Sequence, residues 1–211
     1  MNRALAGGVA ALGLDIDTAA QTKLLAYLAL LDKWNRTHNL SAIREPERMV
    51  THHLLDALAT LRHLPQAATL RLIDVGSGGG LPGLPLAIAR PQWRITLLDS
   101  NGKKAAFLRQ AAAELGIANV AVAAMRAEDY VPDEPFDVAI SRAFADLGQF
   151  AAVARHLVRP GGQLFAMKGV YPREELQALP CALQVVAVPA LEVPGLGAER
   201  HLVIMRAITE T

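Results

Sequence analysis

The sequence has very little cysteine and almost no net charge. Its single cysteine, Cys181, excludes an internal disulfide framework and is typical of a reducing compartment. The formal net charge of +1 over 211 residues excludes the strongly basic body of a non-specific nucleic-acid binder. Any contact with RNA must therefore come from a local basic patch.

The sequence also lacks a long hydrophobic run. No stretch reaches the roughly 18 consecutive apolar residues of a membrane-spanning helix. The amino terminus has only Arg3 as a basic leader, and Gly7 and Gly8 interrupt its apolar residues, so it makes a poor signal peptide. We therefore expect a soluble cytoplasmic protein.

The residues that are present indicate one globular catalytic domain with an appended helical element. Apolar residues make up 52% of the chain and charged residues 19%, a composition far from that of disordered chains. Helical spacing of apolar residues runs from Asp17 to Trp34 and from Pro46 to Leu61. We predict that residues 1–65 form an N-terminal helical extension packed on a catalytic domain of residues 66–211.

Beyond residue 65 the pattern changes to short apolar runs that alternate with helical stretches. Such runs are typical of buried parallel strands, and the alternation predicts βαβ units. The last two runs are joined by a loop without a clear helix, which predicts an antiparallel closing pair. The seven expected strands are 70–75, 95–98, 120–123, 136–140, 163–167, 183–188 and 201–205. The predicted fold class is α/β, a doubly wound, mostly parallel seven-stranded Rossmann-like sheet.

A glycine-rich turn follows the first predicted strand. The spacing Gly78-x-Gly80-x-x-Gly83 satisfies the dinucleotide pattern and by itself would favour NAD. However, Gly76 already starts the turn, and Asp74 stands two residues ahead of it, where a carboxylate would lie awkwardly beside two phosphates. This shift favours a nucleoside cofactor without pyrophosphate, such as S-adenosylmethionine. Asp74 could either hold the turn or receive the cofactor's amino group.

An acidic residue ends the second predicted strand. Asp99 stands about twenty residues beyond the first glycines, where a carboxylate can accept hydrogen bonds from both ribose hydroxyls. Gly78, in the turn, joins Asp99 as a predicted cofactor-binding residue. Asp99 could also cap the helix predicted at 103–115. Residues 126–129 follow the third strand, where an adenine base would lie.

Methyl transfer from a sulfonium needs alignment more than acid–base chemistry, and we expect no metal, because no closely spaced Cys and His ligand set is present. The Asn/Asp-Pro-Pro-aromatic run of exocyclic-amine methyltransferases is missing after the fourth strand. Methylation of a cytosine ring carbon would need a cysteine nucleophile, but Cys181 lies in a late segment of the chain, which argues against this route. A ring nitrogen such as guanine N7 needs no general base. We therefore assign no general base, and predict that Arg142 and Lys168, which follow strand ends, position the substrate.

Basic and aromatic residues are spread around the expected crevice and resemble a dispersed RNA-facing patch. Its members are Arg44, Arg48, His52, Arg142, Phe144, Lys168, Tyr171, Arg173, Arg200 and His201.

Several motifs in one order resemble the ribosomal RNA small-subunit methyltransferase G family, also called glucose-inhibited division protein B. The resemblance runs from about Leu24 to the last strand. The stretches that carry it are 33–40, 53–56, 73–85, 97–100, 140–143, 167–169 and 199–202. Members often have a proline among the turn residues where this chain has Gly79, which should loosen the turn slightly.

The resemblance implies methylation at N7 of one guanine in a stem-loop of 16S rRNA, with S-adenosylmethionine as the donor. It also implies a cofactor pocket that includes Gly76, Leu81, Ala127, Glu128 and Arg142. Two alternatives stay open: an NAD-dependent oxidoreductase, and a cofactor-sensing module that docks on ribosomal particles without turnover. We expect 16S rRNA or the small subunit as partner and a monomeric protein.

Overall fold

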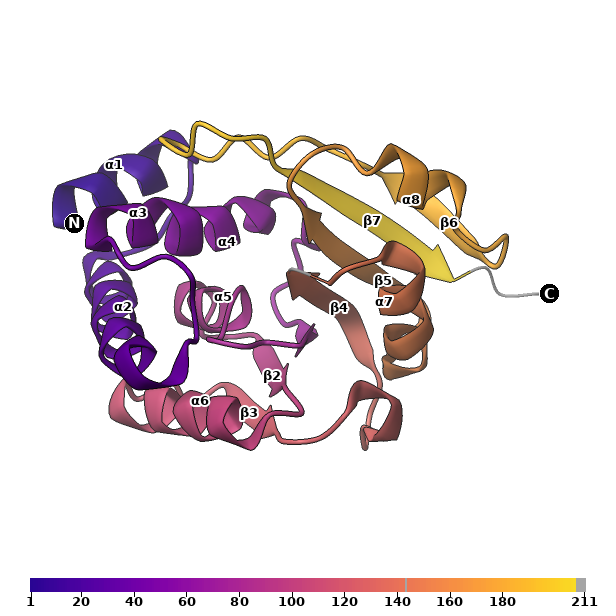
Figure 1. Ribbon diagram of the computed structural model, residues 1–211, viewed down its shortest axis with the longest axis horizontal. Coiled ribbons are helices and arrows are strands. Elements are labelled where there is room, and N and C mark those ends of the chain that lie inside the picture. The colour runs from indigo at the N-terminus through magenta and orange to yellow at the C-terminus, as the bar shows by residue number, and fades with distance from the viewer. Residues whose placement is uncertain (143, 208–211) are drawn as a thin grey trace.

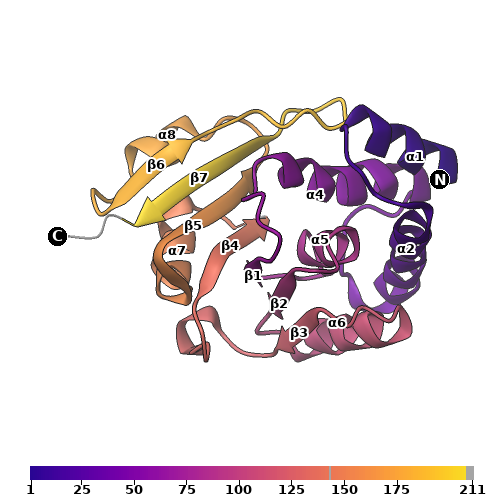
Figure 2. The same cartoon turned by 180° about the vertical axis from the view of Figure 1, so that it is seen from behind.

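The computed structural model describes residues 1–142 and 144–207. A twisted sheet runs through the molecule, with helices on both of its faces (Figures 1 and 2). Within the described residues, no helix is both long enough and apolar enough to cross a membrane.

Helices occupy the chain before the first strand, as the apolar periodicity predicts. The two long predicted helices are observed, but the first extends to His38 and the second is divided into α and π segments. Asp17 caps α2, because its side chain accepts a hydrogen bond from Ala20 N at 2.7 Å. The elements are α1 (Asn2–Ala11), α2 (Thr18–His38), α3 (Pro46–Met49), the π-helix η1 (Val50–Leu55), α4 (Asp56–Ala59) and the 3-10 helix η2 (Thr60–Arg62).

The sheet has seven strands in the order β3-β2-β1-β4-β5-β7-β6. β1 to β5 run parallel, and β7 pairs antiparallel with both β5 and β6. The predicted doubly wound sheet and its antiparallel closing pair are therefore confirmed. The strands are β1 (Arg71–Val75), β2 (Arg94–Leu98), β3 (Val120–Ala123), β4 (Phe136–Arg142), β5 (Val158–Lys168), β6 (Leu183–Ala187) and β7 (His201–Ala207).

The remaining helices connect the strands. We expected helices at 84–90 and 103–115, and each is found within one residue of those bounds at both ends. The connecting helices are α5 (Gly83–Ala89), α6 (Gly102–Glu114), η3 (Ala127–Asp129), α7 (Leu147–Ala154), η4 (Arg155–Leu157) and α8 (Arg173–Gln177). α5 and α6 cover one face of the sheet together with the N-terminal helices, and α7 covers the other (Figure 1).

Two hydrophobic clusters form the core. One combines buried side chains of α1, α2 and the 46–62 helical run with those of α5, α6 and the sheet, among them Leu5, Leu24, Leu58, Leu84 and Phe107. The other lies under α7. Because the N-terminal helices share the first cluster with the sheet layer, their position relative to the strand ends is fixed by apolar packing.

Candidate functional site

The glycine turn after β1 is held to the end of β2 by backbone hydrogen bonds. Gly76 N and Ser77 N both donate to Leu98 O, at 2.8 and 3.0 Å. Gly76 and Gly78 have φ values of +74° and +56°, a left-handed region that side chains rarely adopt. The turn therefore lies open at the carboxyl ends of β1 and β2, where ligands bind in doubly wound sheets.

Asp74 connects the same turn to α5. Its side chain is completely buried, and Oδ2 accepts a hydrogen bond from Gly83 N at 2.9 Å. A Cβ at position 83 would lie 2.7 Å from that oxygen, so this contact requires glycine. Burial raises the pKa of Asp74 to about 7, although the hydrogen bond from Gly83 opposes the shift. This geometry favours the turn-holding interpretation of Asp74.

Asp99 links the turn to a cavity. Its Oδ2 accepts from Gly78 N at 2.9 Å and its Oδ1 from Asn101 N at 2.8 Å, and the residue is 7% exposed. The alternative that Asp99 caps α6 is not observed, because Asn101 is the cap: its Oδ1 accepts from Lys103 N and Lys104 N. The remaining lone pairs of the Asp99 carboxylate can receive ligand hydroxyls.

The glycine-turn cavity has a volume of about 660 Å³. It lies at the carboxyl ends of β1, β2 and β4, and its size suits a nucleoside cofactor. Of the predicted cofactor-binding residues, five line it: Gly76, Asp99, Ala127, Glu128 and Arg142. Its wall also includes Ser100, Lys104, Met125, Arg126, Phe144 and Gln149.

Two predicted cofactor residues do not line this cavity. The amide N of Gly78 donates a hydrogen bond to Asp99 Oδ2, but Gly78 itself does not line the cavity. Leu81 is 4% exposed and packs in the hydrophobic core beneath the turn. In this geometry, both residues affect the cavity only indirectly, by fixing the conformation of the glycine turn.

A second pocket of about 460 Å³, here called the π-turn pocket, lies beside the first. Arg142, at the end of β4, lines both. The chain thus builds two adjoining spaces that one guanidinium separates. The other residues of the π-turn pocket are Leu40, Ser41, Ala42, Ile43, His52, His53, Asp56, Met167, Lys168, Gly169 and Arg200.

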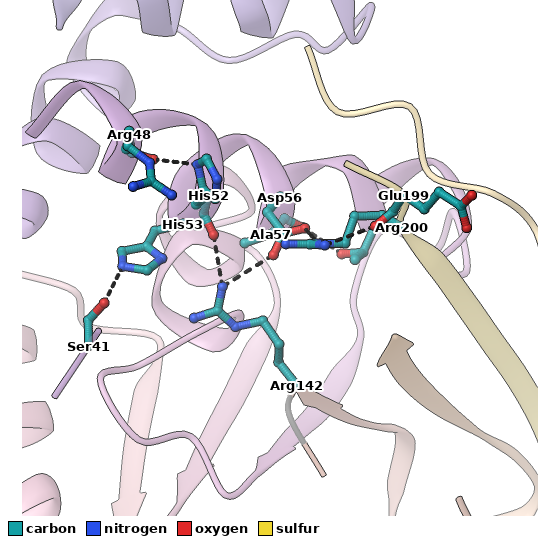
Figure 3. Close-up of polar contacts among 10 residues, drawn as sticks. Ser41, Arg48, His52, His53, Asp56, Ala57, Arg142, Glu199 and Arg200 are labelled. Atoms are coloured by element: carbon teal, nitrogen blue, oxygen red, sulfur yellow. Dashed lines mark hydrogen bonds and ion pairs between the residues drawn. The ribbon is translucent and has the colours of Figure 1, made fainter. Parts of the chain in front are cut away.

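Charged side chains cross the π-turn pocket (Figure 3). Arg142 Nη1 donates to His52 O at 3.0 Å and to Asp56 Oδ2 at 3.2 Å. Arg200 Nε donates to Asp56 Oδ1 at 2.9 Å. The buried carboxylate of Asp56 therefore bridges Arg142 and Arg200, which are far apart in the sequence.

Lys168 is held by other partners. Its Nζ donates to Glu175 Oε2 at 2.7 Å and to Phe144 O at 3.1 Å, and its side chain is 11% exposed. These contacts tie the end of β5 to the segment after β4. Ala143, part of the 140–143 motif, lies outside the described residues.

His53 is a neutral component of the pocket wall. A hydrogen bond of 2.7 Å joins its Nε2 to Ser41 Oγ, and the residue is 3% exposed. Burial, with a smaller contribution from the positive charge of Arg142, lowers the pKa of His53 to about 4. The imidazole therefore adds no charge to the pocket at neutral pH.

The other members of the predicted basic patch differ in exposure, and Tyr171 and Arg173 line a separate pocket. His52 and Arg200 line the π-turn pocket, whereas Arg44, Arg48 and Arg173 are exposed. Tyr171 is 47% exposed and packs edge-on against His201, with ring centroids 5.5 Å apart.

Sequence reasoning included Asp56 in the 53–56 stretch of the resemblance, but it predicted neither the contacts of Asp56 with two arginines nor the pairing of Ser41 with His53. The signal for Asp56 was present, because a carboxylate in a buried apolar helical run requires a cationic partner. Which arginines supply it depends on contacts over 86 and 144 positions.

The comparisons with solved structures agree with this fold. A methyltransferase from Aquifex aeolicus described as S-adenosylmethionine-dependent matches with a TM-score of 0.62 and 15% identity, over 84% of this chain and 97% of that one. TrmN from Thermus thermophilus matches with a TM-score of 0.57 and 20% identity, over 72% and 48%. At these identities the likeness shows the fold, which is that of the class I S-adenosylmethionine-dependent methyltransferases.

The sequence comparisons are more specific. The family model for rRNA small subunit methyltransferase G matches residues 20–203. A protein of Nitrosospira multiformis named ribosomal RNA small subunit methyltransferase G is 52% identical over 209 residues, which cover 96% of this chain and 95% of that protein. A protein of the same name from Neisseria meningitidis serogroup B is 53% identical, over 95% and 96%.

The chain therefore belongs to the rRNA small subunit methyltransferase G family. It is an S-adenosylmethionine-dependent methyltransferase of small-subunit ribosomal RNA. This assignment rejects the two alternatives, the NAD-dependent oxidoreductase and the sensor without turnover.

Proposed function

We propose that the protein methylates N7 of one guanine of 16S rRNA, with the donor in the glycine-turn cavity and the guanine in the π-turn pocket. The observation that carries the proposal is that the two pockets adjoin and share Arg142. A donor and an acceptor that react by in-line displacement must meet across such a boundary.

The residues of the glycine-turn cavity fit S-adenosylmethionine. The Asp99 carboxylate faces the cavity beside the open turn and can accept hydrogen bonds from ribose hydroxyls. Ala127 and Glu128 lie on the wall beyond β3, where we place the adenine base. The bound donor supplies an electrophilic methyl group on a sulfonium.

The π-turn pocket fits an acceptor that needs no base. Attack by a guanine N7 lone pair on the methyl carbon would break the carbon–sulfur bond of a bound donor and would release no proton. Within residues 1–142 and 144–207, the carboxylates at this pocket are engaged: Asp56 by two arginines and, behind Lys168, Glu175 by that lysine. His53 is neutral, with its pKa lowered to about 4. An acceptor that must be deprotonated would find no free carboxylate among the described residues of this pocket.

Arg142 and Lys168 are proposed to position the substrate in different ways. Arg142 stands at the boundary and can contact the base directly. Lys168 fixes the segment after β4 through Phe144 O, so it shapes the pocket wall. Arg44, Arg48 and Arg173 are exposed and can bind RNA phosphates.

We further propose that residues 1–65 act as an extension that completes the acceptor side, because Ser41, His53 and Asp56 come from it. Acting on ribosomal RNA places the expected site of action in the cytoplasm, and we propose that the protein works there as a monomer. The two adjoining pockets are built from residues of one chain.

The test is methyl transfer from labelled S-adenosylmethionine to small-subunit particles that lack this modification, followed by digestion and mass spectrometry of the nucleosides. The expected labelled product is 7-methylguanosine. A labelled nucleoside of another kind would overturn the proposed atom, and absence of labelled RNA would overturn the acceptor.

A further inference from the structure

Asp56 is buried between two cations. It is 1% exposed, and its two oxygens accept hydrogen bonds from Arg142 Nη1 and Arg200 Nε, at 3.2 and 2.9 Å. Each arginine side chain is 24% exposed. The carboxylate therefore lies between two guanidiniums, which reach it from the end of β4 and from the segment of Glu199 and Arg200 (Figure 3).

A π-helical turn brings this carboxylate to the pocket. In an α-helix, Asp56 N would donate to His52 O. Here it donates to Thr51 O, five residues back, and to His53 O. His52 O instead accepts a hydrogen bond from Arg142 at 3.0 Å. The turn therefore supplies both acceptors that hold Nη1, and such π segments often occur at functional sites.

The fixed Nη1 leaves the rest of the guanidinium available to a ligand. Among the described residues, both hydrogen bonds of Arg142 use Nη1, so Nε and Nη2 remain as donors. Arg142 lines both pockets. The orientation of the Arg142 guanidinium therefore determines which of its N–H groups face the acceptor at the boundary between the two pockets.

We propose that Asp56 is a positioning residue for methyl transfer, which holds Arg142 at the boundary of the two pockets and pairs it with Arg200. This proposal rests on the proposed function. Without the carboxylate, two half-buried guanidiniums of like charge would face one another, and both would move toward solvent. Arg142 would then no longer hold the acceptor in line with the methyl group.

The first experiment compares wild type with Asp56→Asn, which keeps the side-chain size and removes the charge. Using small-subunit particles that lack the modification, we expect kcat to fall about 10- to 100-fold, the scale of a misplaced reacting group. The dissociation constant of S-adenosylhomocysteine should rise no more than in Arg142→Met, because Asp56 does not line the glycine-turn cavity.

Asp137→Asn is the matched control. Asp137 lies on β4 like Arg142 but near the opposite end, and its oxygens accept from Arg159 Nε at 2.6 Å and Arg71 N at 2.9 Å. It lines neither pocket. Its variant should lose thermal stability without losing turnover, which separates a positioning effect from a general loss of an ion pair.

A double-mutant cycle gives the decisive readout. If Asp56 acts through Arg142, then Asp56→Asn in an Arg142→Met background should change kcat by less than about 2-fold. Two losses that multiply would show that Asp56 acts independently and would overturn the proposal. Wild-type turnover in Asp56→Asn would overturn it as well.

Arg200→Lys provides a milder variant if Asp56→Asn does not fold. It keeps the charge and loses the Nε donor, so we expect a loss of about 3- to 10-fold in kcat. Unchanged kcat in this variant would overturn the pairing of Arg142 with Arg200. Failure of the proposed function is distinguishable, because the wild type itself would then form no 7-methylguanosine.

Discussion

The two pockets that meet at Arg142 are built from different materials. The glycine-turn cavity is shaped by a backbone turn, in which Gly76, Ser77 and Gly78 donate to Leu98 O and Asp99. The π-turn pocket is shaped by charged and polar side chains from five separate segments. The shape of a pocket made by backbone depends on the conformation of the chain, whereas the shape of a pocket made by charged side chains depends on how their charges are paired. Mutations and pH should therefore affect them differently.

The largest expected effect concerns Asp74 on the cavity side. Its pKa is raised to about 7 in the folded protein, so the folded state binds more protons than the unfolded state between about pH 4 and 7. The free energy of unfolding should therefore decrease as pH rises through this range, by on the order of 4 kcal/mol. Asp74→Asn removes this contribution.

Denaturant unfolding at several pH values measures the contribution of Asp74 to the free energy of unfolding. The stability of Asp74→Asn relative to wild type should improve steadily from pH 4 to 7 and then level off. The exposed Asp15 supplies the control, Asp15→Asn. A difference between Asp74→Asn and wild type that does not change with pH would contradict the argument.

His53, on the pocket side, should show the opposite sign. Its pKa is lowered to about 4, so the unfolded state binds more protons between about pH 4 and 6.5. The free energy of unfolding should fall as pH falls through this range, by about 3 kcal/mol. In His53→Gln this loss should disappear, whereas replacement of the exposed His156 by Gln should leave the wild-type curve. A His53→Gln curve parallel to wild type would reject the buried neutral imidazole.

The cavity side was largely predictable because its information is local. The strand, the turn glycines and Asp74 are contiguous, and Asp99 stands at the end of the next strand, so strand and turn patterns placed them together. The finer geometry could not be read from these patterns. Gly78 and Leu81 lie behind the cavity wall, because the turn folds back onto β2 and buries Leu81.

The pocket side was only partly predictable. The strand pattern placed Arg142 and Lys168 at the carboxyl-end edge of the sheet, where both line the π-turn pocket. The position of Asp56 could not be predicted, since the register that brings it to the π-turn pocket arises from a π turn, and helical periodicity assumes 3.6 residues per turn. Its partnership with Arg200 depends on how β7 and the N-terminal helices pack, which no local pattern encodes.

Asp99 allows a test of binding that is confined to the cavity side. Asp99→Asn should weaken S-adenosylmethionine binding by about 1 to 3 kcal/mol, the scale of a lost charged hydrogen bond, and should leave RNA affinity unchanged. Titration calorimetry measures the first and filter binding the second. Asp129→Asn, an exposed neighbour of the cavity residue Glu128, is the control. Unaltered cofactor affinity in Asp99→Asn would reject the ribose contact.

The smallest expected effect tests how far the acceptor side extends beyond the π-turn pocket. Arg48 is 57% exposed in its side chain and has only a surface pair with Glu45 at 3.5 Å, a contact that contributes little to stability. Its carbonyl accepts a hydrogen bond from His52 Nδ1 at 3.0 Å, and because His52 lines the π-turn pocket, Arg48 lies close to the pocket rim. If it binds an RNA phosphate, Arg48→Ala should weaken RNA binding a few-fold and reduce the salt slope of log K by about 0.7 to 0.9. Its kcat at saturating RNA should stay at the wild-type value, because a phosphate contact positions the RNA without touching the reacting atoms.

Arg109→Ala, on the exposed face of α6, should change none of these quantities. An Arg48→Ala salt slope equal to that of wild type would confine RNA binding to the residues that line the pocket itself.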